Sequence, residues 1–496
     1  MSAAEPFDIV ETTIAEIHAA YLTGTLTARG LVQAYLDRIA AYDQNGPKIN
    51  ALISLNPRTL DEADRLDAVL KSSGLSGPLH GIPVVIKDQA DVKEMPTTLG
   101  SVLFKEHMPG RDCFVAARVR SAGAILLGKA ALGELGAGDT HGSLFGSTRN
   151  PYDLARTVGG SSGGSAASVT ANFTVVAIGQ EGLASIRRPA IWCGIAGMRP
   201  SVGLVSRTGV YEGWPAMNGS LGPMARTVTD MTKLLDVMVG YDADDPATAH
   251  GVGRAPTSFT RALDRNALKG ARLGILREPM GLNSQPDTDD FAKITEVFDR
   301  AVAELRAAGA EIVDPIVIPD LKSLLAQRAF STAERDAAFK VYFGGSANPP
   351  FASRAEVQDS PLFERLMKPT RERWLRSAPE EKYYPSLKAR DTLMTNMLKV
   401  MADHRLDAIV HKAVEHQPTL ISEGVNPPYA EQRGAPHINT FLQTVPSVVV
   451  PAGFTRDGLP AGITFLGRPY DDASMIGYAF AYEQATHHRR APSTTP

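Results

Sequence analysis

The segment "VGGSSGGSAAS", residues 158–168, holds four glycines and four serines in eleven positions. Such a loop can bind a phosphate group, present a nucleophilic serine, or form a tight turn. A phosphate-binding P-loop requires GxxxxGK[ST], and no lysine follows at that position. The dinucleotide fingerprint GxGxxG is also missing from this loop. We therefore do not expect phosphate binding here.

The same loop matches the nucleophile-elbow pattern GxSxG with Ser162 at its centre. That pattern requires a strand directly before the serine, whereas the preceding residues "GSTRNPYDLARTV" are rich in turn formers. It also requires a histidine downstream, and His411, His416 and His437 are only three of eleven. A Ser162 nucleophile remains an alternative at this point.

Other reactive residues predict structural roles. The segment "HKAVEH", residues 411–416, matches neither HExxH nor HxxEH, and no thiol cluster accompanies it. We therefore expect no metal. Cys113 and Cys193 form no CxxC pair, which predicts no disulfide, and Cys193 lies in an apolar stretch typical of a packed thiol. Lys129 is expected to pair with a carboxylate.

Composition narrows the class of protein. The chain has 496 residues, a net charge of -3, 43% hydrophobic and 21% charged residues, which is typical of a globular protein. The near-neutral balance gives no reason to expect nucleic acid or an anionic membrane as partner. The N-terminus lacks a basic region followed by an apolar core, and the apolar stretch 445–454 is too short to span a bilayer. We expect a cytoplasmic location.

Strands and helices are expected to alternate along much of the chain. Apolar β-branched runs predict strands near 82–86, 124–130, 174–180 and 270–279, and amphipathic periodicity predicts helices near 13–24, 112–124 and 291–309. This alternation favours an α/β fold with a largely parallel sheet. Residues 319–405 are instead polar, helix-rich and aromatic, which predicts a helical layer that also covers a pocket. The last residues, 489–496, are expected to be disordered.

Beyond these local patterns, the chain resembles the amidase signature family. The resemblance rests on "GIPVVIKD" (81–88), "GGSSGGSAAS" (159–168), "SIRRPAIWCGIAGMRPSVGLVS" (185–206) and "GLPAGITFLG" (458–467). It is dense over about 80–240 and returns at about 440–468. Several motifs in order over this length are far more specific than one short match.

The resemblance implies a Ser–cis-Ser–Lys catalytic set. The nucleophile falls on Ser185, the bridging serine on Ser161, and the base on Lys87. A serine hydroxyl must lose its proton during attack, and lysine serves as base only if burial lowers its pKa from about 10.4. The resemblance also implies a cis peptide bond between Gly160 and Ser161. Ser162 would then be a neighbour of the bridging serine.

The oxyanion hole implied by the resemblance consists of the backbone N–H groups of Gly182, Leu183, Ala184 and Ser185. The family usually has two small residues directly before the nucleophile, and this chain has Leu183 and Ala184 there. Backbone donors do not depend on the side chain, so the hole survives this change. We expect Leu183 to narrow the acyl side of the site or to form its wall.

The implied fold is a large mixed, mainly parallel β-sheet flanked by helices on both faces, with a helical segment covering the site. One domain would span residues 5–488, with a variable helical region at about 319–435. The implied activity is hydrolysis of a carboxamide by water without a cofactor, and aromatics at 330–351 suggest aryl or apolar amide substrates. Homodimers are common among relatives.

Three alternatives stay open. A carbamate or ester uses the same acyl chemistry. A glutamine amidotransferase subunit that acts on charged tRNA belongs to the same family, although the variant "GQEGLAS" (179–185) and the divergent region 319–435 weigh against it. A non-catalytic binding protein on the same fold is the third alternative, and the intact set of Lys87, Ser161 and Ser185 argues against it.

Overall fold

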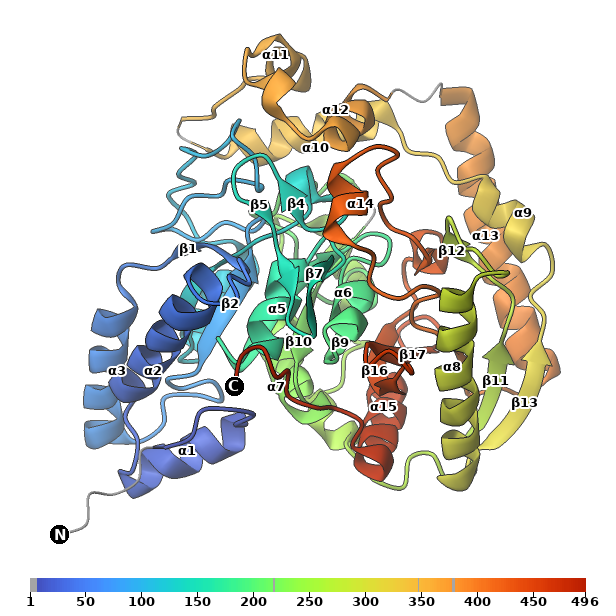
Figure 1. Cartoon of the computed structure of the whole chain (residues 1–496), viewed down its shortest axis with the longest axis horizontal. Helices are drawn as coiled ribbons and strands as arrows, with labels where there is room; N and C mark the ends of the chain where they lie inside the picture. The colour runs from blue at the N-terminus through green and yellow to red at the C-terminus, as the bar shows by residue number, and fades with distance from the viewer. Residues whose placement is uncertain (1–6, 217–218, 347, 377–379) are drawn as a thin grey trace.

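A computed structural model describes residues 7–216, 219–346, 348–376 and 380–496 (Figure 1). Its centre is an eleven-stranded sheet with the order β1-β3-β2-β8-β10-β9-β16-β17-β14-β11-β13. These strands are β1 (Leu52–Leu55), β2 (Pro83–Lys87), β3 (Ile125–Ala130), β8 (Val176–Glu181), β9 (Ala196–Arg199), β10 (Ser220–Ala225), β11 (Arg272–Leu276), β13 (Glu311–Ile316), β14 (Ala408–Lys412), β16 (Ser447–Phe454) and β17 (Pro460–Leu466).

The sheet is mixed, as the resemblance implies. Strands β3, β2 and β8 are parallel, and so are β14, β11 and β13. Between these two groups the strands β8, β10, β9, β16, β17 and β14 pair antiparallel. The parallel groups coincide with the predicted alternation of strands and helices, because a parallel pair requires a crossover connection. Three small two-stranded sheets join β4 (His141–Gly142) to β5 (Gly146–Ser147), β6 (Arg149–Asn150) to β7 (Asp153–Thr157), and β12 (Gly281–Leu282) to β15 (Ala435–Pro436).

Helices cover both faces of this sheet, since every residue of β2, β3, β8, β9 and β10 is buried. The α-helices outside residues 319–405 are α1 (Ile14–Thr23), α2 (Ala28–Ile39), α3 (Thr59–Ser73), α4 (Phe114–Ser121), α5 (Gly163–Thr170), α6 (Arg187–Trp192), α7 (Val228–Met238), α8 (Asp289–Ala307), α14 (Ile421–Val425) and α15 (Asp472–Thr486). Helices α5 and α6 contact each other and the central strands, and α7 and α15 likewise pack together against strands of the sheet.

Local sequence signals mark several helix ends correctly. Thr13 and Glu16 form a capping box at the start of α1, and Gly24 ends that helix in the left-handed conformation. Helix α8 ends just before Gly309, close to the predicted end of this helix, and β13 follows it. In the part of the chain that is described, no helix has the length and apolarity needed to cross a membrane.

The predicted helical layer comprises α9 (Leu321–Ala326), α10 (Thr332–Gly344), α11 (Arg354–Asp359), α12 (Lys368–Leu375) and α13 (Glu380–Asp403). In Figure 1, α10, α11 and α12 lie along the top of the molecule, and α9 and α13 lie at its right. We call α9–α13 the helical cover. Polar contacts fasten it to the rest of the chain. Among them, the hydroxyl of Tyr342 donates to Asp91 at 2.5 Å, and the Met367 N–H donates to Glu134 at 3.0 Å.

The C-terminal residues, for which the sequence predicts disorder, are instead placed against the rest of the chain. Arg489 pairs with Glu11 at 2.7 Å, and Thr494 donates to the carbonyl of Pro151 at 2.5 Å. The side chain of Arg38 donates to the carbonyls of Thr495 and Pro496. These contacts join residues that lie far apart in the sequence, so the local composition of the polar, proline-containing tail does not predict them.

The glycines at the start of α5 allow that helix to approach the sheet closely. A Cβ atom at Gly164 would lie 2.4 Å from the carbonyl oxygens of both Ala131 and Ala51. The N–H of Gly164 donates to the same Ala131 carbonyl at 2.9 Å. Close packing of backbone against backbone therefore explains part of the glycine content of the loop.

We predict that Gly164→Ala destabilises the fold, because backbone atoms on the facing strand cannot move aside for a Cβ. The expected loss in free energy of unfolding is about 1–3 kcal/mol, as for other overpacked interiors. Urea unfolding followed by circular dichroism measures it. The matched control is Gly344→Ala at the end of α10, where nothing lies within 4 Å of the added atom. Equal stability of the two variants would contradict this account of α5.

Candidate active site

Lys87 is the last residue of β2, and its side chain is fully buried. Because β2 pairs parallel with β8, the carboxyl ends of both strands lie at the same edge of the sheet. The Lys87 Nζ donates to Ser161 Oγ at 2.8 Å and to the carbonyl of Gln180, near the end of β8, at 3.3 Å. The sheet thus brings the lysine to the glycine–serine loop.

Ser161 connects this amine to Ser185. Its Oγ lies 3.0 Å from Ser185 Oγ, which completes a hydrogen-bonded chain from Lys87 through Ser161 to Ser185. The peptide bond between Gly160 and Ser161 is cis, as the resemblance implies. A hydroxyl both donates and accepts, so the direction of this chain reverses when the lysine loses a proton.

Burial lowers the pKa of Lys87 to about 7. Desolvation disfavours the ammonium form, and the carboxylates of Glu181 and Glu212 oppose this effect without overcoming it. The neighbouring Asp88 does not pair with Lys87, because it forms a buried ion pair with Lys129 at 2.9 Å. The predicted structural pairing of Lys129 is confirmed, and no carboxylate among the described residues forms an ion pair with Lys87.

The loop around Ser161 is held from several sides. The N–H of Gly133 donates to the Ser161 carbonyl at 3.0 Å, and the N–H of Ser162 donates to the Ser185 carbonyl at 3.0 Å. Arg188, on α6, donates to the Gly160 carbonyl at 3.1 Å and pairs with Asp139 at 2.5 Å, both side chains being buried. These bonds fix the two serines relative to each other.

A second buried ion pair shapes the loop that carries Ser185. The Glu181 carboxylate accepts from the N–H groups of Ile186 and Arg187 at 2.9 Å, and it pairs with Arg187 Nε at 2.6 Å. Arg187 also donates to the carbonyl of Leu183 at 2.8 Å. One carboxylate and one guanidinium therefore hold residues 182–186 between β8 and α6.

The predicted oxyanion donors face a cavity. Gly182, Leu183, Ala184 and Ser185 all line it, and within the described residues none of their N–H groups donates a hydrogen bond to the protein. Leu183, expected to narrow the site or to form its wall, is among the residues that line the cavity. Free N–H groups beside a serine hydroxyl are the arrangement that stabilises a negative carbonyl oxygen.

This cavity has a volume of about 860 Å³ and is bounded by both the sheet edge and the helical cover. Its cover side includes Arg328, Phe330, Trp374 and Arg376. The aromatics that suggested an aryl pocket mostly lie elsewhere: Phe339, Tyr342, Phe343 and the partly buried Phe351 pack in a core cluster beneath the cover. Of the aromatic set at 330–351, Phe330 is the residue in the cavity wall.

Ser162, the alternative nucleophile, is fully buried. Its hydroxyl donates to the Gln180 carbonyl and accepts from the Gln180 N–H, both at 3.1 Å. Ser162 does not line the cavity. It lies directly before α5, and no strand leads into it, as a nucleophile elbow would require. The geometry therefore gives Ser162 a packing role at the start of α5.

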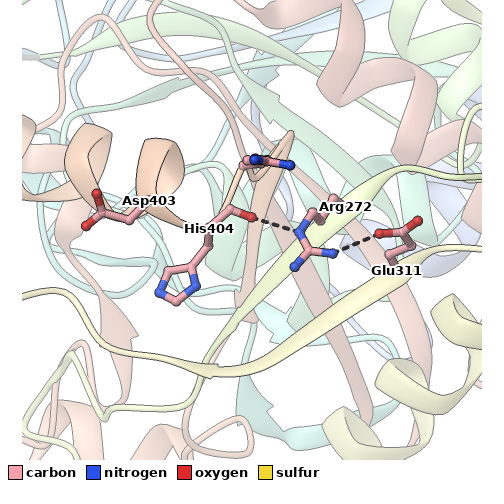
Figure 2. A pocket seen from close by; sticks show the side chains of 5 residues that line it. Arg272, Glu311, Asp403 and His404 are labelled. Carbon is pink, nitrogen blue, oxygen red and sulfur yellow. Dashed lines mark hydrogen bonds and ion pairs between the residues drawn. The ribbon is translucent and has the colours of Figure 1, made fainter.

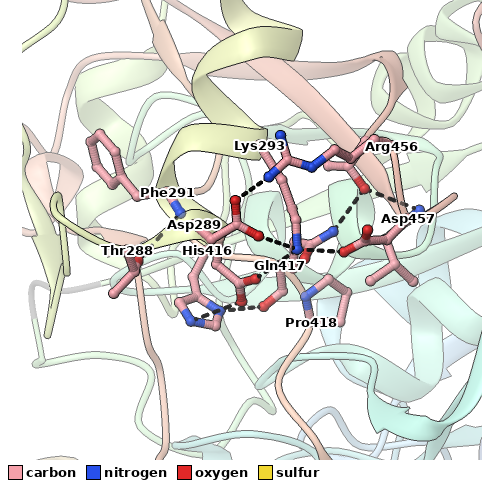
Figure 3. A network of polar contacts seen from close by, with 12 residues as sticks. Thr288, Asp289, Phe291, Lys293, His416, Gln417, Pro418, Arg456 and Asp457 are labelled. Atoms are coloured by element: carbon pink, nitrogen blue, oxygen red, sulfur yellow. Dashed lines mark hydrogen bonds and ion pairs between the residues drawn. The ribbon is translucent and has the colours of Figure 1, made fainter.

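The two histidines of "HKAVEH" have different surroundings. His411 is buried in β14. His416 faces Asp290 at 3.1 Å and lies beside a polar network that includes Lys293 (Figure 3). Lys293 itself contacts Asp289 and Asp457 at 2.9 and 2.6 Å. Over the described ranges, no group of three histidine, cysteine or acidic side chains is placed to hold a metal ion. Cys193 is buried, and burial raises the pKa of its thiol.

A second cavity of about 500 Å³ lies where β11, β13 and the end of α13 meet (Figure 2). Arg272 pairs there with Glu311 at 2.8 Å and donates to the carbonyl of His404 at 2.8 Å. These charges satisfy one another, and neither serine nor cysteine lines this cavity. It offers no arrangement for the chemistry described above.

Sequence reasoning identified the two serines and the lysine but missed the groups that hold them. The doublet Arg187–Arg188 lies just after Ser185, separated from it by Ile186, whereas nothing in the sequence assigned the partners Glu181 and Asp139. The cationic residues of the helical cover were also missed, because nothing in the local pattern at 319–405 links them to the site.

Comparison with known proteins identifies the family of this chain. The Amidase family model matches residues 30–476. The peptide amidase from Stenotrophomonas maltophilia superposes with a TM-score of 0.83 at 32% identity, covering 99% of this chain and 100% of that one. A glutamyl-tRNA(Gln) amidotransferase subunit of Methanosarcina barkeri is 31% identical over 94% of this chain and 96% of its own. A probable amidase of Arabidopsis thaliana is 32% identical over 98% of this chain and 92% of its own.

The fold, the order of the sequence motifs and the similarity to these proteins agree over almost the whole length of the chain. The protein is an enzyme of the amidase signature family, and it carries the family's lysine segment at 81–88 and its serine segments at 159–168 and 185–206.

Proposed function

We propose that this enzyme hydrolyses a carboxamide C–N bond through an acyl-enzyme on Ser185. The observation that carries the proposal is the chain of hydrogen bonds from the buried Lys87 through Ser161 to Ser185 at the cavity wall. A serine with an adjacent base of suitable pKa is an activated nucleophile. Neutral Lys87 is that base, and Ser161 relays the proton.

In the first step Ser185 Oγ attacks the carbonyl carbon while its proton passes through Ser161 to Lys87. The oxygen that becomes negative is held by the N–H groups of residues 182–185. The C–N bond then breaks, and the proton on Lys87 returns through Ser161 to the leaving nitrogen. Water attacks the acyl-enzyme by the same route, which releases the carboxylic acid and restores Ser185.

A carbamate or an ester would pass through the same steps, since both present a carbonyl carbon to Ser185. A carboxamide is the preferred assignment, because a poor leaving group requires the returned proton that the Lys87–Ser161 relay supplies. The similar peptide amidase supports an extended amide substrate, and the cavity of about 860 Å³ has room for one. Phe330 and Trp374 would contact an apolar or aryl part of it.

We predict that a fluorophosphonate labels the protein once and that the adduct forms on Ser185. Intact-mass spectrometry should show one adduct on wild type and on Ser162→Ala, and none on Ser185→Ala. Amide hydrolysis by Ser185→Ala should fall by a factor on the order of 10⁴ or more. Labelling that disappears only in Ser162→Ala would instead assign the nucleophile to Ser162.

The pH dependence of kcat/KM should follow Lys87. Below its pKa of about 7 the amine is charged and cannot accept a proton, so activity should rise with pH through a midpoint near this value. Lys87→Met should lower kcat by about 10²–10⁴-fold and remove that midpoint. A wild-type profile that stays flat from about pH 5 to about pH 9 would exclude Lys87 as the base.

We also infer that the enzyme acts without tRNA or partner subunits, unlike the amidotransferase subunits that it resembles. Supporting this, the helical cover of the same chain completes the cavity above Ser185. The purified chain should hydrolyse an amide at a rate that changes less than about twofold when glutamyl-tRNA and amidotransferase partner subunits are added. Strong stimulation, together with amidotransfer to the tRNA, would favour the amidotransferase alternative.

A further inference from the structure

The helical cover carries cations that no carboxylate neutralises. Arg328 lies between α9 and α10, Arg376 follows α12, and Lys382 lies in the first turn of α13; all three line the cavity that holds Ser185. Within the described ranges, none of the three forms an ion pair. Arg188 and Arg373, which also line the cavity, each form one. The unpaired charges are therefore confined to the cover side.

Acidic side chains in the cavity wall are already engaged. Glu431 pairs with Arg373, and Glu212 lies 3.8 Å from Arg335. The others accept from hydroxyl or N–H groups or pair at the surface: Glu134 from Ser143 and Met367, Glu334 from Tyr383 at 2.9 Å, and Glu372 with Lys368 at 3.9 Å. The cavity wall carries six cationic and five acidic side chains, an excess of one positive charge.

Arg328 and Arg376 also influence each other. The surrounding protein and the nearby guanidinium of Arg376 both lower the pKa of Arg328. Both side chains are exposed to solvent, so water screens much of the repulsion between them, and an anion that binds both removes more of it. Guanidinium groups bind carboxylates with two parallel hydrogen bonds, so a pair of arginines at a cavity wall is suited to that group.

We propose that the substrate is a primary carboxamide whose acyl portion carries a carboxylate, which binds to Arg328 and Arg376 with Lys382 beside them. The scissile amide lies at Ser185 and the carboxylate at the helical cover. An acidic peptide amide has this chemistry. The inference rests on the proposed function, since it describes the substrate of the same site.

The test uses three peptide amides that differ in one charge: acetyl-Glu-Phe-amide, acetyl-Gln-Phe-amide and acetyl-Lys-Phe-amide. The glutamate and glutamine compounds are almost identical in shape, so their ratio isolates the carboxylate. We expect kcat/KM to fall in the order Glu, Gln, Lys, with about tenfold between the first two through KM, as for a hydrogen-bonded charge.

Arg328→Gln with Arg376→Gln should reduce the Glu-to-Gln ratio to about one. The matched control is Lys322→Gln on the exposed side of α9, which removes one positive charge from the same cover away from the cavity. It should keep the wild-type ratio. A ratio near one in wild type, or a ratio that survives the double substitution, would overturn the proposal.

Binding to Ser185→Ala separates this proposal from the proposed function. Calorimetry should give a Kd for the glutamate compound about tenfold lower than for the glutamine compound, with no hydrolysis needed. If wild type labels at Ser185 and hydrolyses all three compounds equally, the carboxylate site is wrong and the catalytic assignment stands. If the charge preference appears in binding but Ser185 neither labels nor turns over, the carboxylate site stands and the catalytic assignment is wrong.

Discussion

The active site depends on the burial of one amine. A lysine in water is protonated at neutral pH, and it becomes a base only where the ammonium form loses its solvation. Lys87 ends a central strand of the sheet, and its neighbour Asp88 is committed to Lys129. Because that second lysine occupies the carboxylate, the Nζ of Lys87 contacts a hydroxyl and a carbonyl instead. In the proposed mechanism, this buried ion pair leaves Lys87 available as the base.

The glycine–serine loop serves that amine by bringing backbone close to backbone. Gly164 lies against two strands, and the carbonyl of Gly160 accepts from Arg188 on the helix that follows Ser185. The two serine loops are joined directly, since the N–H of Ser162 donates to the Ser185 carbonyl. Small residues are needed here because the facing backbones lie too close for a larger side chain. The hydroxyl of Ser162, the second serine in the loop, has a packing role.

The cavity has two walls of different character. One wall is the sheet edge, where Ser185 and the free N–H groups define the reaction. The other is the helical cover, fastened to the core by Tyr342 and Glu134 and carrying the unpaired guanidinium groups of Arg328 and Arg376. In our proposals, the first wall performs the chemistry and the second selects the substrate. The aromatics of the cover mainly form its own core and so hold it together.

The sequence by itself determined what short-range physics controls: helix caps such as Thr13, the apolar strands, and, through ordered family motifs, the set of Lys87, Ser161 and Ser185. It did not determine the antiparallel centre of the sheet, the partners of buried charges, or the position of residues 489–496. These features depend on contacts between segments that lie far apart in the sequence, and hydrophobic periodicity carries no information about such contacts. The charge of Arg328 was visible in the sequence, but only the tertiary structure placed it in the cavity, because its neighbours there come from separate elements.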